Sequence, residues 1–248
     1  EEMSSMKKPD RPDLAALQNY YMLADPELGY VPVERLKEGY QAAERIRHES
    51  MLRSNRSSIQ WQATGANMGG RTRAIMYDPN DASGNKVWAG SVTGGLWYKT
   101  EITNDLYPWL PVDDFWDNLA ISSITYDPND PMTFYVGTGE AETAVTIYRE
   151  SSGVGMGIMK STDGGETWEL LPSTSGFKYV TDVVVRDEDG TSVIYAGVVS
   201  GIYKGIVHQS EPNDGLYRSD DGGLTWEQVL PDMEGSDAPY PVSDIEIA

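Results

Sequence analysis

One short sequence occurs twice in this chain, at residues 161–168 and 219–226, with the shared pattern S-x-D-G-G-x-T-W. Its Asp can accept hydrogen bonds from the amides of a tight turn, and its two glycines supply the positive φ that such a turn requires. The following Thr and Trp favour a strand whose indole needs a large buried site. Each copy therefore predicts a β-hairpin, and a repeated hairpin predicts a repeat architecture. We expect the motif residues to be structural: Ser161, Asp163, Gly164, Gly165, Thr167, Trp168, Ser219, Asp221, Gly222, Gly223, Thr225 and Trp226.

Other segments recur with the same spacing of about 50 to 60 residues. The turn sequence Asp-Pro-Asn-Asp follows Tyr77 and again Tyr126, and residues 187–190 take its place a third time. Short strand-like runs flank each turn, which gives four predicted strands per unit, as in a blade of a β-propeller. The predicted fold class is therefore all-β, a propeller of four-stranded antiparallel blades. We expect blades at about 59–112, 117–173 and 179–232, and the first strand of a next blade at 240–248.

Residues 1–57 lack these repeats and predict a helical N-terminal arm, followed by a propeller body at 58–248. Residues 34–53 predict one helix, preceded by a stretch that we expect four prolines to break into short pieces. One apolar stripe of this helix should face a neighbour, in this chain or in another, through Leu36, Tyr40, Ala43 and Ile46. Because three blades do not close a ring, we expect the sequence to be the N-terminal part of a longer protein or assembly.

The formal net charge is −20, and nearly all of it falls on the propeller body. Such a body repels phosphate backbones, which argues against nucleic acid as a partner. No apolar run is long enough to span a membrane. The chain has no cysteine, which excludes disulfides and thiol catalysis and fits an exported protein. The two histidines lie far apart without zinc-ligand spacing, so we predict no cofactor and no metal site, with calcium left open.

The repeated motif resembles the Asp box, or BNR repeat, of β-propellers such as sialidases, sortilin-type receptors, xyloglucan-cleaving glycosidases and photosystem assembly factors. All these classes carry the box, so it predicts the hairpin but no activity. The stretch from Trp61 to Arg73 is also similar to the first blade of large exported bacterial surface propellers, many of them sent out by type IX secretion. The resemblance covers about residues 58–248 and implies a secreted or cell-surface bacterial protein after removal of a signal peptide.

The resemblance to xyloglucanases implies a catalytic Asp in blade one, within a segment like Ala-Arg-Thr-Asp-x-Gly-Gly-x-Tyr-Arg. The matching stretch here is 89–98, and Val92 stands at the position of the Asp. A glycosidase needs two carboxylates that flank the scissile bond, so we predict no catalytic residue in this chain. A weaker alternative gives part of that role to Asp182 or Asp244, with the remaining carboxylates beyond residue 248.

In a propeller, the loops between strands two and three and between blades share one face, and loops usually carry binding residues. Alignment of the first strands on their turns puts Arg73, Ser122, Asp182 and Asp244 at equivalent positions at the mouth of the channel. These groups could bind a ligand or pair with one another. The predicted ligand-binding set on this loop-rich face is Arg71, Arg73, Ser122, Trp116, Tyr148 and Tyr203.

The sequence thus favours a non-catalytic, exported or cell-surface propeller module that binds a protein or glycan through its loop-rich face, as part of a larger protein. Two alternatives remain. One is a xyloglucanase-like glycoside hydrolase whose carboxylates lie mostly beyond residue 248. The other is a scaffold or assembly factor in a multi-protein complex, which the N-terminal arm favours.

Overall fold

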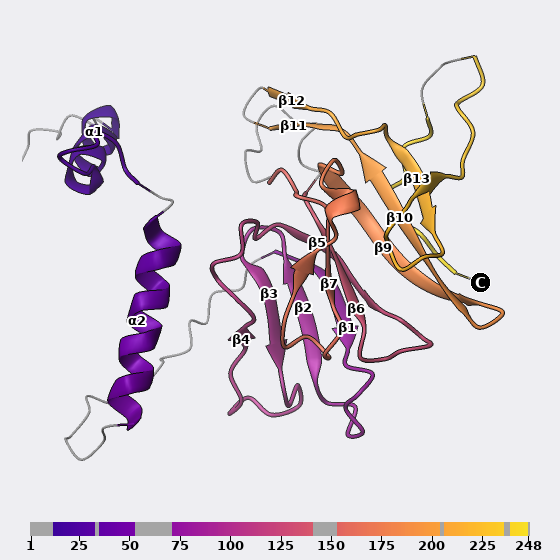
Figure 1. Ribbon diagram of the computed structural model, residues 1–248, viewed down its shortest axis with the longest axis horizontal. Coiled ribbons are helices and arrows are strands. Elements are labelled where there is room, and N and C mark those ends of the chain that lie inside the picture. The colour runs from indigo at the N-terminus through magenta and orange to yellow at the C-terminus, as the bar shows by residue number, and fades with distance from the viewer. Residues whose placement is uncertain are drawn as a thin grey trace, which may run out of the picture. The chain divides into compact units, whose positions relative to one another are not determined.

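A computed structural model describes residues 12–32, 35–52, 71–140, 153–203, 206–235 and 239–247. The chain divides into two compact units, residues 1–64 and 65–248. The first unit contains helix α1 (Pro12–Leu23) and helix α2 (Arg35–Leu52), and α2 confirms the helix predicted over 34–53 (Figure 1). Helix α1 corrects our expectation of short broken pieces, because Pro12 occupies the first helical position, where a missing amide proton is tolerated. Within this unit Tyr40 and Ile46 are exposed, so the neighbour of their stripe stays a prediction.

The second unit contains three four-stranded antiparallel sheets, which we call blades 1 to 3. Blade 1 consists of β1 (Thr72–Tyr77), β2 (Val87–Ser91), β3 (Gly95–Lys99) and β4 (Leu110–Pro111). Blade 2 consists of β5 (Ile121–Tyr126), β6 (Phe134–Thr138), β7 (Ile158–Ser161) and β8 (Glu169–Leu170). Blade 3 consists of β9 (Tyr179–Glu188), β10 (Thr191–Val199), β13 (Gly215–Ser219) and β14 (Glu227–Gln228). Each blade runs through its four strands in chain order, which confirms the predicted fold class of propeller blades.

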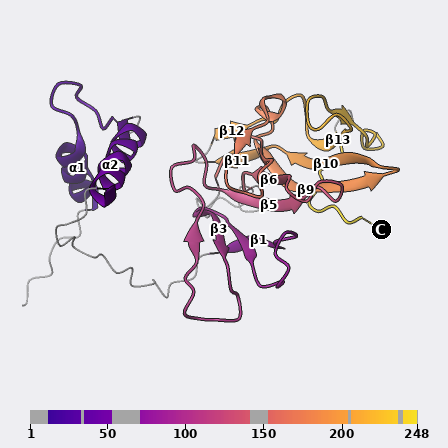
Figure 2. The ribbon, with the colours of Figure 1, turned by 60° about the horizontal axis from the view of Figure 1, so that its bottom comes forward.

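The first strands of the three blades follow one another in space: β1 lies next to β5, and β5 lies next to β9 (Figure 2). Residues 241–247 continue this series without forming a strand, which corrects the strand predicted there. Their attachment to β9 uses side chains: the Thr181 hydroxyl donates to the Val242 carbonyl at 2.6 Å, and Asp182 accepts from the Ile245 amide at 3.0 Å. A strand needs a backbone ladder, and no described residue pairs with this segment in that way.

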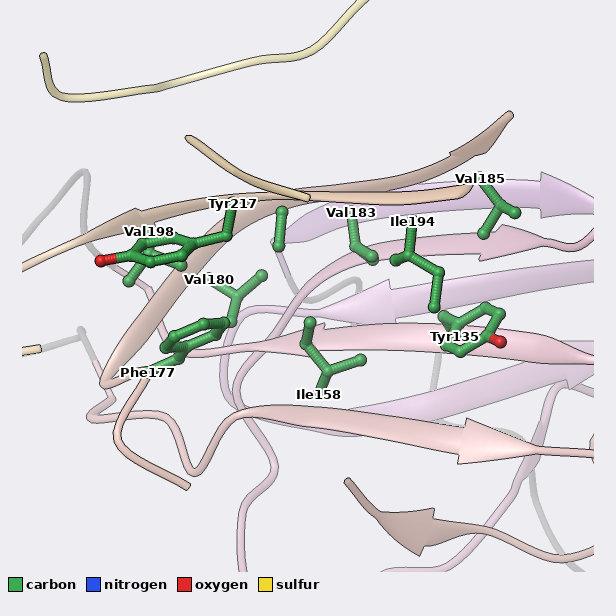
Figure 3. Packing of buried hydrophobic residues seen from close by; sticks show 10 residues of the cluster. Tyr135, Ile158, Phe177, Val180, Val183, Val185, Ile194, Val198 and Tyr217 are labelled. Carbon is green, nitrogen blue, oxygen red and sulfur yellow. The ribbon is translucent and has the colours of Figure 1, made fainter. Parts of the chain in front are cut away.

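The apolar core lies between successive blades. One cluster combines Trp88 and Leu96 of blade 1 with Ile121 and Phe134 of blade 2. The other brings Tyr135 and Ile158 of blade 2 against residues of blade 3, among them Val183 and Ile194 (Figure 3). Each blade therefore buries its side chains against the next one rather than within itself.

Both Asp boxes close their turns as the motif predicts. Asp163 accepts hydrogen bonds from the amides of Glu166 and Thr167 and from the Thr167 hydroxyl, and Asp221 makes the equivalent contacts. The bonds from Thr167, hydroxyl and amide, hold the pKa of Asp163 at about 2. Residues 159–160 pair with 169–170, and residues 217–218 pair with 227–228, as antiparallel strands, so both predicted hairpins are confirmed.

The two box tryptophans, which we expected to be largely buried, are only partly buried. Trp168 packs on the core between blades 1 and 2, and Trp226 packs on the core between blades 2 and 3. Each indole thus packs at the seam, the interface between its own blade and the preceding blade. The indole lies at the edge of this interface, so part of each ring stays in contact with solvent.

The Asp-Pro-Asn-Asp turns also join one blade to the next. The Asn80 side chain in blade 1 donates to the Pro131 carbonyl in blade 2 at 2.8 Å. The equivalent Asn129 in blade 2 donates to Asp187 and Ser192 of blade 3, at 3.3 Å and 3.1 Å. The repeated Asn is therefore an inter-blade donor in both turns.

Candidate functional site

A cavity of about 680 Å³ lies where the first strands begin. Its walls come from β1, β5, β9 and the segment 241–247, and they include all four residues predicted for the channel mouth: Arg73, Ser122, Asp182 and Asp244. The remaining lining residues are small hydroxyl or aliphatic side chains: Thr72, Ala74, Ile75, Ser123, Ile124, Thr181 and Ser243. Their role in ligand binding stays a prediction.

The first strand of each blade carries a β-bulge at this cavity. The position of the bulge in blade 3 shifts our alignment of that strand by one residue. Opposite each bulge, a glycine of the second strand marks the same position in every blade. Gly90 pairs with Ala74, Gly137 with Ser123, and Gly197 with Asp182. Asp182 is therefore equivalent to Ser123, whereas the bulged positions are Arg73, Ser122 and Thr181. A bulge re-aims a side chain in a way that sequence spacing does not reveal.

Asp182 joins three neighbouring strands or segments. One carboxylate oxygen accepts from the Ser123 hydroxyl of blade 2 at 2.6 Å, and the other accepts from the Ile245 amide at 3.0 Å. The Ser123 oxygen in turn accepts from the Val183 amide at 3.1 Å. The same type of hydrogen bond therefore occurs twice. Ser123 of blade 2 accepts from an amide of blade 3, and Asp182 of blade 3 accepts from an amide of the segment 241–247.

The surroundings of Asp182 favour its neutral form more than water does. Burial raises the pKa of Asp182, and the adjoining Asp244 carboxyl adds to the increase, while the bonds from Ser123 and Ile245 oppose it. Asp244 itself is exposed. The two acids therefore form one interacting pair at the cavity wall.

Ser122 lines the cavity, and its role in ligand binding stays a prediction. Its hydroxyl oxygen is buried and finds no hydrogen-bond partner among the described residues. It lies 3.0 Å from where a Cβ on Gly137 would stand, which places it against the backbone of the second strand of its own blade. Ser123, which the sequence analysis did not single out, makes the contact across the blades instead.

Two arginines stand at the start of β1. Arg71 is exposed, and its carbonyl accepts from the Val92 amide at 3.0 Å; Arg73 is partly buried in the cavity wall. Val92, at the position where the resemblance implies a catalytic Asp, is an apolar side chain only 2% exposed. The described part of blade 1 therefore offers no carboxylate at that position.

The three aromatic residues of the predicted ligand-binding set are Trp116, Tyr148 and Tyr203, and they lie in different parts of the chain. Trp116 packs edge-on against Trp168 with ring centroids 5.6 Å apart, so it serves the core between blades 1 and 2. Tyr148 lies outside the described residues. Tyr203 lies on a two-stranded ribbon, β11 (Gly201–Tyr203) and β12 (Ile206–His208), with its ring 6.5 Å from that of His208. We did not predict this ribbon, although the β-branched and aromatic run around a Lys-Gly pair was a readable hairpin signal.

Within the described ranges, no group of three or more His, Cys, Asp or Glu side chains is arranged to hold a metal ion. Helices α1 and α2, as far as they are described, are too short or too polar to cross a bilayer.

The blades and boxes together define a class of structural unit: propeller-type blades that carry Asp-box (BNR) repeats. The BNR/Asp-box repeat model matches residues 159–170 and 217–228. Within this class, the chain is similar to a xyloglucanase of Paenibacillus sp, with 28% identity over 67% of this chain. It is also similar to the xyloglucanase Xgh74A of Acetivibrio thermocellus, with 27% identity over 65% of this chain. The chain spans 15% and 18% of the lengths of these two relatives.

Two solved structures that resemble part of the chain are GH74 enzymes. An ancestral GH74 enzyme aligns with a TM-score of 0.48 and 24% identity, over 70% of this chain and 20% of that one. The GH74 enzyme of Niastella koreensis aligns with a TM-score of 0.43 and 21% identity, over 68% of this chain and 22% of that one.

Proposed function

We propose that this chain is a non-catalytic recognition module, exported or displayed at the cell surface, that binds a protein or glycan. Its binding end is the one where the first strands begin, around the cavity. Small hydroxyl groups, two carboxylates and an arginine line this cavity, which suits a polar ligand.

The observation that carries the proposal is Val92. A glycosidase of the resembled type needs a carboxylate there, and a buried valine can neither donate nor accept a proton. The relatives named xyloglucanases favour a second candidate, a glycoside hydrolase that uses Asp182 or Asp244. Against it, both oxygens of Asp182 already accept hydrogen bonds from Ser123 and Ile245, so this group is committed to joining the blades.

Arg71 is the group we assign to ligand orientation. It is an exposed cation next to the cavity on a strongly acidic body, so an anionic group is attracted here and repelled across most of the surface. Arg73, which is partly buried in the wall of the cavity that the two carboxylates also line, is assigned a structural role.

Two measurements test the proposal. In the first, the purified chain is incubated with xyloglucan, and we expect no release of reducing sugar. Release that Asp182→Asn or Asp244→Asn abolishes would establish the hydrolase instead.

In the second measurement, electrophoretic retardation is recorded in gels containing polygalacturonate, an acidic glycan, or neutral xyloglucan. We expect polygalacturonate to retard the wild type and Arg71→Ala to lose the retardation without a change in melting temperature. Arg73→Ala should lower the melting temperature and keep the retardation. If Arg71→Ala is retarded like the wild type, the assignment of Arg71 is wrong.

A further inference from the structure

The ribbon β11–β12 leaves blade 3 between β10 and β13 as a separate two-stranded sheet (Figure 1). Its strands pair antiparallel, with Ile202 opposite Val207 and Tyr203 opposite Ile206. No other described strand pairs with either of its edges. Both edges therefore offer backbone amides and carbonyls to an incoming strand.

The ribbon carries apolar side chains on both faces. Opposite residues of an antiparallel pair share a face, so Ile202 and Val207 lie on one side and Tyr203 and Ile206 on the other. Ile202, Ile206 and Val207 are 48%, 62% and 63% exposed. Exposed aliphatic side chains beside an open edge are avoided in most soluble proteins, and where they occur they mark contact surfaces.

The base of the ribbon is fixed to the blade. The Ser200 hydroxyl donates to Asp214 at 2.5 Å and accepts from the Ser210 amide at 2.9 Å. The buried Ser210 hydroxyl donates to the Val199 carbonyl at 2.7 Å and accepts from the Lys178 amide at 3.0 Å. Because the open edge is held in place before binding, less ordering is required when a partner binds.

The charge of the chain indicates which class of partner protein the ribbon would bind. Residues 200–210 contain one Lys and no Asp or Glu, whereas the whole chain carries a net charge of −20. A second copy would bring the same negative charge and be repelled, whereas a basic partner is attracted. Glu211 and Asp214 follow the ribbon in the sequence, and Asp214 accepts a hydrogen bond from Ser200 at the ribbon base.

We propose that the β11–β12 ribbon is a strand-addition site for an extended, basic segment of a partner protein, in which apolar side chains alternate with Lys or Arg. Backbone hydrogen bonds to the open edge supply affinity, and the alternate apolar side chains cover Ile202 and Val207. The basic side chains meet the acidic body. This surface is separate from the cavity, so its failure would leave the proposed recognition at Arg71 untouched.

Three synthetic peptides labelled with a fluorophore serve as probes, and anisotropy measures their binding to the whole chain. The first alternates Val and Lys, the second alternates Val and Glu, and the third is the first with a central Pro that removes an edge donor. We expect the Val-Lys peptide to bind and the other two to bind at least about tenfold weaker, a difference of about 1.4 kcal/mol.

The matched variants are Val207→Asp and Leu224→Asp. Leu224 is 74% exposed on the turn of an Asp box, so it offers the same change of charge and apolarity outside the ribbon. We expect Val207→Asp to weaken binding of the Val-Lys peptide at least about tenfold, and Leu224→Asp to leave it unchanged. An added carboxylate strengthens attraction of a basic peptide, so binding by charge alone predicts the opposite result. Melting curves by circular dichroism verify that both variants fold.

Three outcomes would overturn the proposal. One is equal or tighter binding of the Val-Lys peptide to Val207→Asp. Another is equal binding of the peptide with the central Pro, because strand addition needs the edge donor. The last is self-association of the chain in sedimentation experiments that Val207→Asp abolishes, which would make a second copy the occupant.

Discussion

The hydroxyl of Ser123 donates a hydrogen bond of 2.6 Å to the carboxylate of Asp182, which lies 59 residues further along the chain. The bond links the first strands of blades 2 and 3. Asp182 extends the link to the segment 241–247 through the Ile245 amide. The polar wall of the cavity is thus also part of the joint between blades.

Ser122 and Ser123 provide a matched pair for testing this joint. We expect Ser123→Ala to lower the free energy of unfolding by about 1–3 kcal/mol, because it removes a donor from a partly buried carboxylate. Ser122→Ala should be neutral or slightly stabilising, because it removes a buried hydroxyl without a partner among the described residues. Urea unfolding of the two variants measures both effects. Equal losses for the two would mean that the Ser123 bond is not stabilising.

The raised pKa of Asp182 makes a prediction about pH. Burial, with the adjoining Asp244 carboxyl, raises its pKa above 3.8, so the folded chain holds this proton more tightly than the unfolded chain. Its contribution to the free energy of unfolding is therefore largest below pH 3.8 and declines as the pH rises through the raised pKa. Asp182→Asn lacks this titration, so the difference in stability between the variant and the wild type should move in favour of the variant as the pH rises above about 4. Asp189→Asn, at an exposed turn, is the matched control for changing an acid to its amide.

The box tryptophans should differ in their contribution to stability. Trp168 packs against Trp88, Trp116 and Phe134 at centroid distances of 6.5, 5.6 and 6.4 Å, whereas Trp226 meets Phe177 at 5.7 Å. A fully buried large aromatic loses about 3–5 kcal/mol on truncation to Ala, and partial exposure lowers this value. We expect about 3 kcal/mol for Trp168→Ala and about 2 kcal/mol for Trp226→Ala from denaturant unfolding. The reverse order would contradict the packing described here.

Two glycines with the same backbone conformation separate strain from steric clash. Gly165 and Gly190 have φ of 89° and 87°. A Cβ on Gly165 would stand 2.4 Å from the Trp88 ring, whereas a Cβ on Gly190 would meet no atom within 4 Å. We expect Gly190→Ala to lose about 1 kcal/mol through strain, and Gly165→Ala to lose about 2–4 kcal/mol because the seam between blades must open as well. Similar losses for both would show that the seam adapts.

The sequence predicts strands and boxes well because their signals are local. Turn residues and alternating apolar residues predict four strands in each of the three blades, as the structure has them. The alignment of the channel mouth failed in blade 3, where Thr181 and not Asp182 occupies the bulge. The bulge is present in all three blades, so it does not cause this shift. The turn used for the alignment begins six residues after the bulge in blade 3 and five residues after it in blades 1 and 2.

The side-chain environments were harder to predict. The exposure of Trp168 depends on the neighbouring blade, and so does the use of Trp116 as a core residue. The burial of Ser122 follows from its bulge and from Gly137 opposite. The cavity itself could be foreseen, because it follows from the repetition of first strands around one axis.

The asparagine bonds between turns have a consequence for how the chain is made. Asn80 donates forward to Pro131, and Asn129 donates forward to Asp187 and Ser192, so each bond joins a blade to the one synthesised after it. A chain emerges from the ribosome at about 5–20 residues per second, and domains generally fold as units from the N-terminus. Each blade can therefore be locked a few seconds after it appears, when the turn of its successor emerges. Assembly then proceeds in the order of translation, and unpaired blade faces are exposed only briefly.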